Sequence, residues 1–501
     1  MKKQILSRVF LALSITTLMS WPFQISAETP ESTEKLSTEE RLALTEQRLA
    51  ESEQRILELE RKLEQVLGFS QADSASAPDP ATSTPPSLEV PGAEVEAQMA
   101  MASAVDTSAA TGETTVESDD LLGDVREKHQ LLTREELVSD DFPASWPMFG
   151  TNTRMKIGGY LKADMVVDLD GTLDGTQFLM RTIPVEGTPE YGGDPYVDFF
   201  ARETRINLDI RRNAPGSPPL RGFIEGDFFS DGDNFRLRHA YITAGNFILG
   251  QTWTTLSFLE AMPFMIDFAA GDALFGGRAS QIRYQHSLDD RWKFSVALEE
   301  LQFLGIQNAN LLPGKATSQF PLLALRADHR LDNGLLLMGV SLGQLHWDGG
   351  LEGPSDSAVQ LSAVFAGRHN LAQNAYATWH FSYTEGGGEN IISFAGTDAN
   401  AVLGADGTLD TFSSFSSLLG IGYNWTPTWS SNLSYAYGWL DTPDSRDPLA
   451  LKRGGIGHIN LIWKPTERFS AGAEFMWGVT RVQNDALGKA QRFQFMGKYE
   501  F

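Results

Sequence analysis

The sequence predicts an all-β transmembrane barrel of about sixteen antiparallel strands, preceded by an α-helical coiled coil. Three observations lead to this fold class. From Met155 onward, segments of about ten residues alternate apolar and polar side chains, as strands with one lipid-facing side do. Short turns and long loops alternate between these segments. The chain also ends on a strand-like segment, "QRFQFMGKYEF" (491–501), with no polar tail after it.

Composition excludes several classes of protein. The chain has 501 residues, with Lys+Arg 40 against Asp+Glu 65 and a formal net charge of -25. Nucleic-acid binding needs a basic surface, so we expect no nucleic-acid partner. Because the chain has no cysteine, it can form no disulfide, thiolate or cysteine-based zinc site, and it offers no lipoprotein acylation site.

Residues 1–27 have the features of an export signal peptide. Basic residues precede the apolar run "VFLALSITTLM" (9–19), and "ISA" (25–27) offers a small residue for cleavage. A membrane anchor is the alternative, but the run is shorter than the roughly 20 apolar residues that span a bilayer. No later segment reaches that length, so we do not expect helices to carry the chain across a membrane.

A coiled coil is predicted for residues 28–69. Apolar and small residues fill the a and d positions of about four heptads, namely Leu42, Leu49, Ile56 and Leu63 in one row and Thr45, Ser52, Leu59 and Val66 in the other. The segment "RILELE" (55–60) resembles a short motif of three-stranded coiled coils, so we favour a trimer over a dimer. A single amphipathic helix packed on a domain is less consistent, because no globular sequence adjoins it.

Two further segments separate the coiled coil from the barrel. Residues 70–120 are rich in Ala, Ser, Thr, Pro and acids, with few large apolar residues to bury, and are predicted to form a disordered linker. Residues 121–154 are a lead-in segment that has room for a short helix. The barrel is predicted to span residues 155–501.

Strand faces follow from the alternation. In the first strand, Leu161 and Met165 share the face predicted to meet lipid, and Lys162 and Asp164 share the lumen face. In the last strand the predicted lipid face holds Phe493, Phe495, Tyr499 and Phe501, and the lumen face holds Arg492, Lys498 and Glu500. Turn residues mark short connections at 213, 288, 331, 426 and 464, and long polar loops are expected at 170–198, 301–320, 386–411 and 440–453. Short turns at one rim and long loops at the other are typical of outer-membrane barrels.

The sequence contains no catalytic or metal-binding motif. Its histidines are scattered (His 8), and His239 and His286 fall on the outward side of their strands, near a membrane interface. We therefore expect no enzyme activity and no cofactor or metal. An outer-membrane hydrolase is the alternative, because sequence spacing cannot exclude a Ser and a His that meet in space.

Basic residues on the predicted lumen face are the candidate binding site. They are Lys162, Arg205, Arg221, Arg236, Arg238 and Arg283, together with Lys156. Glu225 and Asp227 also point inward, so the wall is mixed. One interpretation is that these charges only keep the pore wet, and the other is that they select anions.

The connection "SFLEAMPFMIDFAAGDALFGG" (257–277) is too apolar for an exposed loop. Folded into the barrel, it would form a constriction and bring Met262, Phe264, Met265 and Phe268 towards the channel. Alternatively, the loop packs against the barrel wall or a neighbouring subunit.

The segments "MKIGGYLKADMVVDLDG", "RETRINLDIR", "GFIEGDFF", "LRHAYI" and "GQTWTTL", in this order across residues 155–256, resemble the DcaP-like family of outer-membrane porins. The resemblance implies a homotrimer of sixteen-stranded barrels with a periplasmic coiled coil, in the outer membrane of a Gram-negative bacterium. It further implies uptake of small organic anions such as dicarboxylates, guided by pore arginines, and a third long loop that narrows the pore. Arg202 is left out of the predicted set because it has the opposite parity.

The function predicted from the sequence is passive, anion-selective uptake of small organic acids. The expected partners are small anionic solutes, outer-membrane lipid and two further copies of the chain, and the coiled coil makes the cell wall a further candidate partner. Two alternatives stay open: a structural anchor with a periplasmic spacer, and a non-selective diffusion pore.

Overall fold

The structure is a computed structural model that describes residues 142–148, 152–230, 233–269, 272–443 and 446–501. All of these belong to one compact unit of the chain, Thr111–Phe501. The predicted signal peptide, coiled coil and linker, and most of the predicted lead-in segment, lie outside the described residues.

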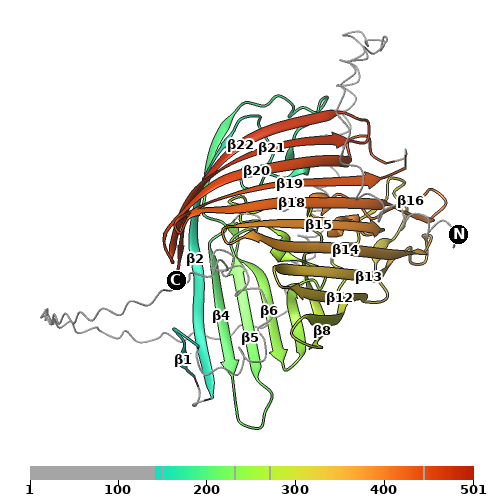
Figure 1. Cartoon of the computed structure of the whole chain (residues 1–501). Helices are drawn as coiled ribbons and strands as arrows, with labels where there is room; N and C mark the ends of the chain where they lie inside the picture. The colour runs from blue at the N-terminus through green and yellow to red at the C-terminus, as the bar shows by residue number, and fades with distance from the viewer. Residues whose placement is uncertain (1–141, 149–151, 231–232, 270–271, 444–445) are drawn as a thin grey trace, which may run out of the picture. The chain divides into compact units, whose positions relative to one another are not determined.

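The described residues form a closed antiparallel barrel of sixteen strands (Figure 1), which confirms the predicted fold class. Each strand pairs with the next along the chain, and β22 pairs with β2 to close the ring. β3 and β4 are two halves of one crossing, because both pair with β2. The crossings are β2 (Thr153–Asp168), β3 (Tyr196–Phe200) with β4 (Arg205–Arg212), β5 (Leu220–Asp227), β6 (Arg236–Ala244), β7 (Phe247–Trp253), β8 (Arg278–Ser287), β9 (Trp292–Glu299), β12 (Leu322–Leu331), β13 (Gly334–Asp348), β14 (Asp356–Ala372), β15 (Ala375–Glu385), β18 (Ser413–Thr426), β19 (Trp429–Asp441), β20 (Leu451–Thr466), β21 (Phe469–Val482) and β22 (Leu487–Glu500).

Short strands and 3-10 turns are added to this ring of sixteen strands. β1 (Trp146–Pro147) pairs with the start of β2, and β11 (Lys315–Thr317) pairs with β13. β10 (Ile306–Gln307), β16 (Ala401–Leu403) and β17 (Leu409–Thr411) form a separate small sheet. The loops also contain single 3-10 turns, η2 (Met180–Thr182), η4 (Leu259–Ala261), η5 (Gly388–Asn390) and η6 (Ile392–Phe394). No helix in the described ranges is long and apolar enough to cross a bilayer.

Connections alternate in length as predicted. Short turns such as 245–246 and 332–333 lie at one rim, which also holds β1 and the C-terminal Phe501. The opposite rim carries the long loops, of which four are named here: L1 (169–195), L2 (228–235), L3 (254–277) and L6 (386–412). Outer-membrane barrels have short turns on the periplasmic side and long loops outside.

Side chains alternate across the wall in the predicted register. In β22, Phe493 and Phe495 are 39% and 40% exposed on the outside, whereas Arg492 and Gln494 are fully buried inside. An apolar outer face and a polar inner face are what a barrel in lipid requires. The predicted orientation of the last strand is therefore confirmed for these residues.

Apolar residues inside the barrel form a core on one half of the wall. L1, L3 and L6 fold inward and pack on inward-facing residues of β13 to β22, as Phe178, Leu274 and Phe394 do against Leu418 and Ile456. Two loops expected to be polar, at 170–198 and 386–411, thus carry buried apolar segments. The other half of the wall, from β2 to β8, carries charged side chains such as Arg221 and Glu225 beside a small apolar cluster (Phe223, Tyr241 and Ile248), and it faces the remaining lumen.

Candidate functional site

The six basic residues predicted to line the pore lie on the inner wall between β2 and β8. Lys162, Arg205, Arg221, Arg238 and Arg283 are buried within the barrel, and Arg236 keeps 30% of its side chain exposed. Strand alternation explains their shared direction, because each lies on the inward row of its strand. Glu225 and Asp227 are also inside, as predicted.

Carboxylates accompany these arginines. Arg221 binds Asp209 with two hydrogen bonds of 3.0 and 3.1 Å, and Arg236 binds Asp227 with two of 3.0 and 2.9 Å. Arg283 lies 3.7 Å from Glu299. Parallel N–H···O bonds fix the plane of a guanidinium as well as its position, so these arginines are held in place before any solute arrives.

One part of the wall has more cations than anions. We call it the arginine cluster, and it consists of Arg205, Arg236, Arg238 and Arg278 with Glu225 and Asp227. Arg238 contacts both carboxylates, at 3.1 and 2.7 Å, and Arg205 lies 3.6 Å from Glu225. The charge of Arg278 interacts with the charges of the other three arginines and of Asp227. Four guanidinium groups share two carboxylates within this cluster, so guanidinium groups are in excess, and the neighbouring Glu203 pairs with Lys162.

An aromatic pair lies against the arginine cluster. Phe268 of L3 stacks on Phe229 of L2, with ring centroids 4.1 Å apart and an interplanar angle of 13°. Arg236 lies over both rings, at 5.6 and 5.5 Å, and Arg238 lies 5.6 Å from the ring of Phe268. L3 therefore reaches the basic wall through Phe268, one of its four predicted constriction residues.

The other three constriction residues pack on the opposite wall. Met262 lies against the large apolar core, and Phe264 packs with Ile266 against Ile462 and Met496. The sulfur of Met265 lies 3.4 Å from the side-chain nitrogen of Asn460. L3 thus spans the lumen from the apolar wall to the arginine cluster. It both enters the channel and packs against the barrel wall, the two arrangements that the sequence left open.

Buried polar groups hold L3 across the lumen. The carboxylate of Glu474 accepts hydrogen bonds from the backbone N–H of Ile266 (2.7 Å) and Asp267 (3.2 Å) and from the side chain of Asn460 (3.0 Å). From β2, two strands further along the ring, the Lys162 ammonium donates to the carbonyl of Ile266 at 2.7 Å. Lys162 also pairs with Glu203 and lies 3.4 Å from Asp164, so it anchors the loop in addition to lining the wall.

Two aspartates of L3 are buried where the loop meets L1. Asp267 accepts the backbone N–H of Phe178 at 3.2 Å, and Asp272 accepts that of Met180 at 3.1 Å. Burial raises the pKa of both carboxyl groups to about 7, because ionisation inside the protein loses the hydration of the charge. The packing of L1 on L3 therefore favours their neutral form.

Neutral polar groups line the wall from β13 to β19. Its inward rows carry hydroxyl and amide side chains, among them Ser341, Gln360, Ser382, Thr384 and Ser416. These side chains are buried and carry no charge, so they do not cancel the field of the arginine cluster.

Strand irregularities explain the residues that the alternation misplaced. A bulge in the pairing of β5 with β6 makes Arg238 an extra residue, so His239 turns inward and is fully buried, with Nδ1 3.1 Å from the hydroxyl of Thr252. The outward position predicted for His239 is therefore wrong, whereas His286 is exposed on the outside as predicted. The break between β3 and β4 likewise brings Arg202 to within 5.7 Å of the Phe229 ring. Each irregularity inserts one residue, which reverses the parity after it.

Two members of the site had weaker sequence signals. Arg278 lies on the outward parity of β8, but it directly follows Gly276 and Gly277, and Gly276 has a positive φ of 121° that ends L3. Phe229 stands in L2 directly after Phe228, and such apolar residues are unusual in an exposed loop. The paired glycines before Arg278 and the two adjacent phenylalanines at the start of L2 could have indicated both residues.

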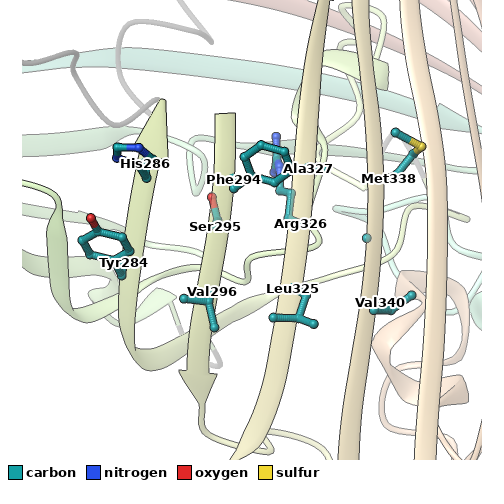
Figure 2. A pocket seen from close by; sticks show the side chains of 11 residues that line it. Tyr284, His286, Phe294, Ser295, Val296, Leu325, Arg326, Ala327, Met338 and Val340 are labelled. Carbon is teal, nitrogen blue, oxygen red and sulfur yellow. The ribbon is translucent and has the colours of Figure 1, made fainter. Parts of the chain in front are cut away.

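A hollow of about 560 Å³ lies on the outer surface, away from the lumen. Figure 2 shows it over Ala327, whose small side chain sits between Phe294 and Met338 on the neighbouring strands. The flanking Leu325 and Val340 are 45% and 47% exposed on the apolar outer face. Its position facing the bilayer separates the hollow from the channel.

In the part of the chain that the structure describes, no three His, Cys, Asp or Glu side chains are grouped so as to hold a metal ion. The arrangement is that of a polar passage with fixed charges.

Comparison with known proteins gives a consistent result. The model of the family described as "DcaP outer membrane protein" matches residues 130–501. Among solved structures, the chain is similar to the outer membrane channel DcaP of Acinetobacter baumannii, with a TM-score of 0.60 and 19% identity over 70% of this chain and 98% of that one. This similarity shows a common barrel fold.

More distant similarities extend to other outer-membrane proteins. An anion-selective porin from Comamonas acidovorans has a TM-score of 0.49 and 11% identity, covering 70% of this chain and 100% of that one. OmpT of Vibrio cholerae has a TM-score of 0.44 and 13% identity, covering 70% of this chain and 98% of that one. No curated protein matches the chain.

Proposed function

Because the chain belongs to the DcaP outer membrane protein family and is therefore an outer-membrane porin, we propose that it lets small organic anions diffuse passively into the periplasm with anion selectivity. Family and fold are those of a channel, not of an enzyme. The expected solutes are small acids such as dicarboxylates.

The observation that carries this proposal is the net charge of the arginine cluster. Its two carboxylates are each shared between guanidinium groups, as in the contacts of Arg238 with Glu225 and Asp227. The local potential is therefore positive at the point where L3 narrows the lumen. A basic patch on the channel wall attracts anions and repels cations, provided that acids do not cancel its charge.

The pairing of these guanidinium groups with protein carboxylates also suits transport. A carboxylate of the solute can bind a guanidinium at two points, but here it must compete with Glu225 or Asp227 for the same N–H groups. Binding is consequently weak enough for release, which flux through a channel requires. Beside these groups, the ring of Phe268 offers an apolar contact for the hydrocarbon part of an organic acid.

A reversal-potential measurement in a salt gradient tests the proposal. Wild-type protein in a planar bilayer should prefer anions, and the double variant Arg236→Ala with Arg238→Ala should lose much of that preference. A succinate-like or phthalate-like acid should interrupt the wild-type current and not that of the variant. Arg291→Ala with Arg330→Ala is the matched control, because both residues are exposed at the rim and Arg291 pairs there with Asp332.

Three results would contradict this assignment: a cation-selective wild type, an unaltered Arg236 and Arg238 variant, or a control that changes as much as the variant. A conducting but unselective wild type would indicate a general diffusion pore. A silent wild type would favour a structural anchor.

The proposed assembly is a homotrimer in the outer membrane of a Gram-negative bacterium, with residues 28–69 as a periplasmic coiled coil. Two features support this proposal. The heptad repeat contains a segment similar to a trimer motif. The barrel's first strand also begins at the short-turn rim, which faces the periplasm in such barrels.

A further inference from the structure

The chain enters the barrel through a short segment that touches the lumen wall. We call residues 142–147 the docking segment. Its last two residues are strand β1, which pairs with Arg154 and Met155 at the start of β2, beside which it lies in Figure 1. β1 occupies the same edge of β2 that β22 covers further up, where Phe501 donates a backbone hydrogen bond to Gly159. It therefore covers an edge that would otherwise be open.

Two cationic side chains fix the rest of the docking segment. Arg154 donates hydrogen bonds of 2.7 Å each to the hydroxyl and the carbonyl of Ser145. The guanidinium of Arg211 lies 3.9 Å from the centre of the Phe142 ring, a close cation–π contact. The Ser145 hydroxyl in turn donates to the Phe142 carbonyl at 2.5 Å, which closes a tight turn. The docking segment is thus held against the barrel wall by specific contacts.

These contacts lie on the inner side of the wall. Arg211 follows Arg205 and Asp209 on the inward row of β4, and it pairs with Asp209 at 2.9 Å. Arg154 is the register partner of Arg211 on β2. Asp209 also binds the buried Arg221, which places the docking segment at the short-turn end of the same basic wall that carries the arginine cluster.

We propose that the docking segment partly closes the periplasmic mouth of the channel and withdraws Arg154 and Arg211 from passing anions. The inference rests on the channel proposed above. When the segment is docked, the ring of Phe142 covers one guanidinium and Ser145 occupies the donors of the other. When it leaves, the mouth widens and two further cations face the lumen. The junction with the N-terminal part of the chain is then also a control point for flow.

Releasing the segment is the direct test. The double variant Phe142→Ala with Ser145→Ala, in the full chain, should have a higher single-channel conductance than wild type. Its reversal potential should shift further towards the value for a pure anion channel. Adding Arg154→Gln and Arg211→Gln should remove that extra shift while the conductance stays high. Phe247→Ala is the matched control, because Phe247 lies at the same rim but is 47% exposed on the outside.

The ratio of variant to wild-type conductance decides the inference, whatever ion the wild type prefers. Equal conductance of the double variant and wild type would overturn it, even if both are anion-selective. A wild type without anion preference would instead count against the proposed function, so the two failures are distinguishable.

An engineered disulfide that locks the docking segment onto β2 provides a second test, which does not depend on the folding of the alanine variant. The natural chain has no cysteine, and Trp146 and Met155 are direct cross-strand partners. Partners of this kind have Cα atoms about 4.5–5.5 Å apart, within the range that a disulfide bridges. In the variant Trp146→Cys with Met155→Cys, oxidation should lower the mean current and reduction should restore it. A current that oxidation leaves unchanged or raises would contradict the proposal.

Discussion

Replacing Glu474 by glutamine should release L3 from the wall of the barrel. The carboxylate accepts four hydrogen bonds, two from the L3 backbone, one from Asn460 and one from Nδ1 of His458 at 3.0 Å. Each oxygen serves two of these donors. In Glu474→Gln, an NH₂ group replaces one oxygen and faces at least one backbone N–H of L3, so at least one hydrogen bond is lost.

The expected loss is large for a loop. A buried donor left without an acceptor costs about 1–3 kcal/mol, so the attachment of L3 should weaken by at least that amount. Lys162 and Asn460 still hold the carbonyl groups of Ile266 and Phe264, which keeps part of the attachment. L3 should therefore detach intermittently, while the sixteen strands remain assembled.

Single-channel recording and limited proteolysis measure this release. The Glu474→Gln channel should show frequent transitions to a higher conductance. Chymotrypsin, which cleaves after aromatic residues, should cut within L3 faster than in wild type. Glu300→Gln is the control, because Glu300 is exposed at the end of β9. Current traces and cleavage rates equal to those of wild type would refute the assignment of Glu474 as the anchor of L3.

Three further predictions concern other parts of the chain. Phe495→Arg should cost about 2–4 kcal/mol near the bilayer midplane and impair assembly more than Gln494→Arg, and equal yields of folded protein would mean a register shifted by one residue. Deleting residues 28–120 should leave a trimeric barrel in native mass spectrometry, because contact between barrel walls exceeds that of one short coiled coil, and a monomer would contradict this. Burial raises the pKa of Asp272 from its ordinary value of 3.8 to about 7 in the folded protein, so this group contributes stability that is full below about pH 3.8 and lost as pH rises through 7. Between about pH 5 and about pH 9, thermal unfolding of wild type should show a loss of at most about 3 kcal/mol from Asp272, and the total loss should be smaller in Asp272→Asn, where Asp267 still titrates in this range.

Local alternation was enough to predict the barrel and most of its inward residues. The rows that hold Lys162, Arg205 and Arg221 on the inside follow directly from period two. The bulge beside Arg238 could not be predicted, because an inserted residue changes no local composition, yet it turns His239 from the outer face to the lumen.

Contacts between distant segments were also beyond the sequence. That L3 is anchored by Glu474, about two hundred residues later, follows from the closure of the ring and not from any local pattern. The apolar residues of L1 and L6, such as Phe178 and Phe394, were visible in the sequence. Their burial depends on the space that L3 leaves inside the barrel.

The seam between β2 and β22 has a consequence for how the protein is made. Asp164 and Gln494 bond across it although they are 330 positions apart in the chain. Every other strand of the ring pairs with neighbours that emerge just before or after it during synthesis. The first strand must therefore wait, with one edge open, until the last residues have been exported. Because distant pairings form slowly and open edges promote aggregation, ring closure should limit the rate of folding.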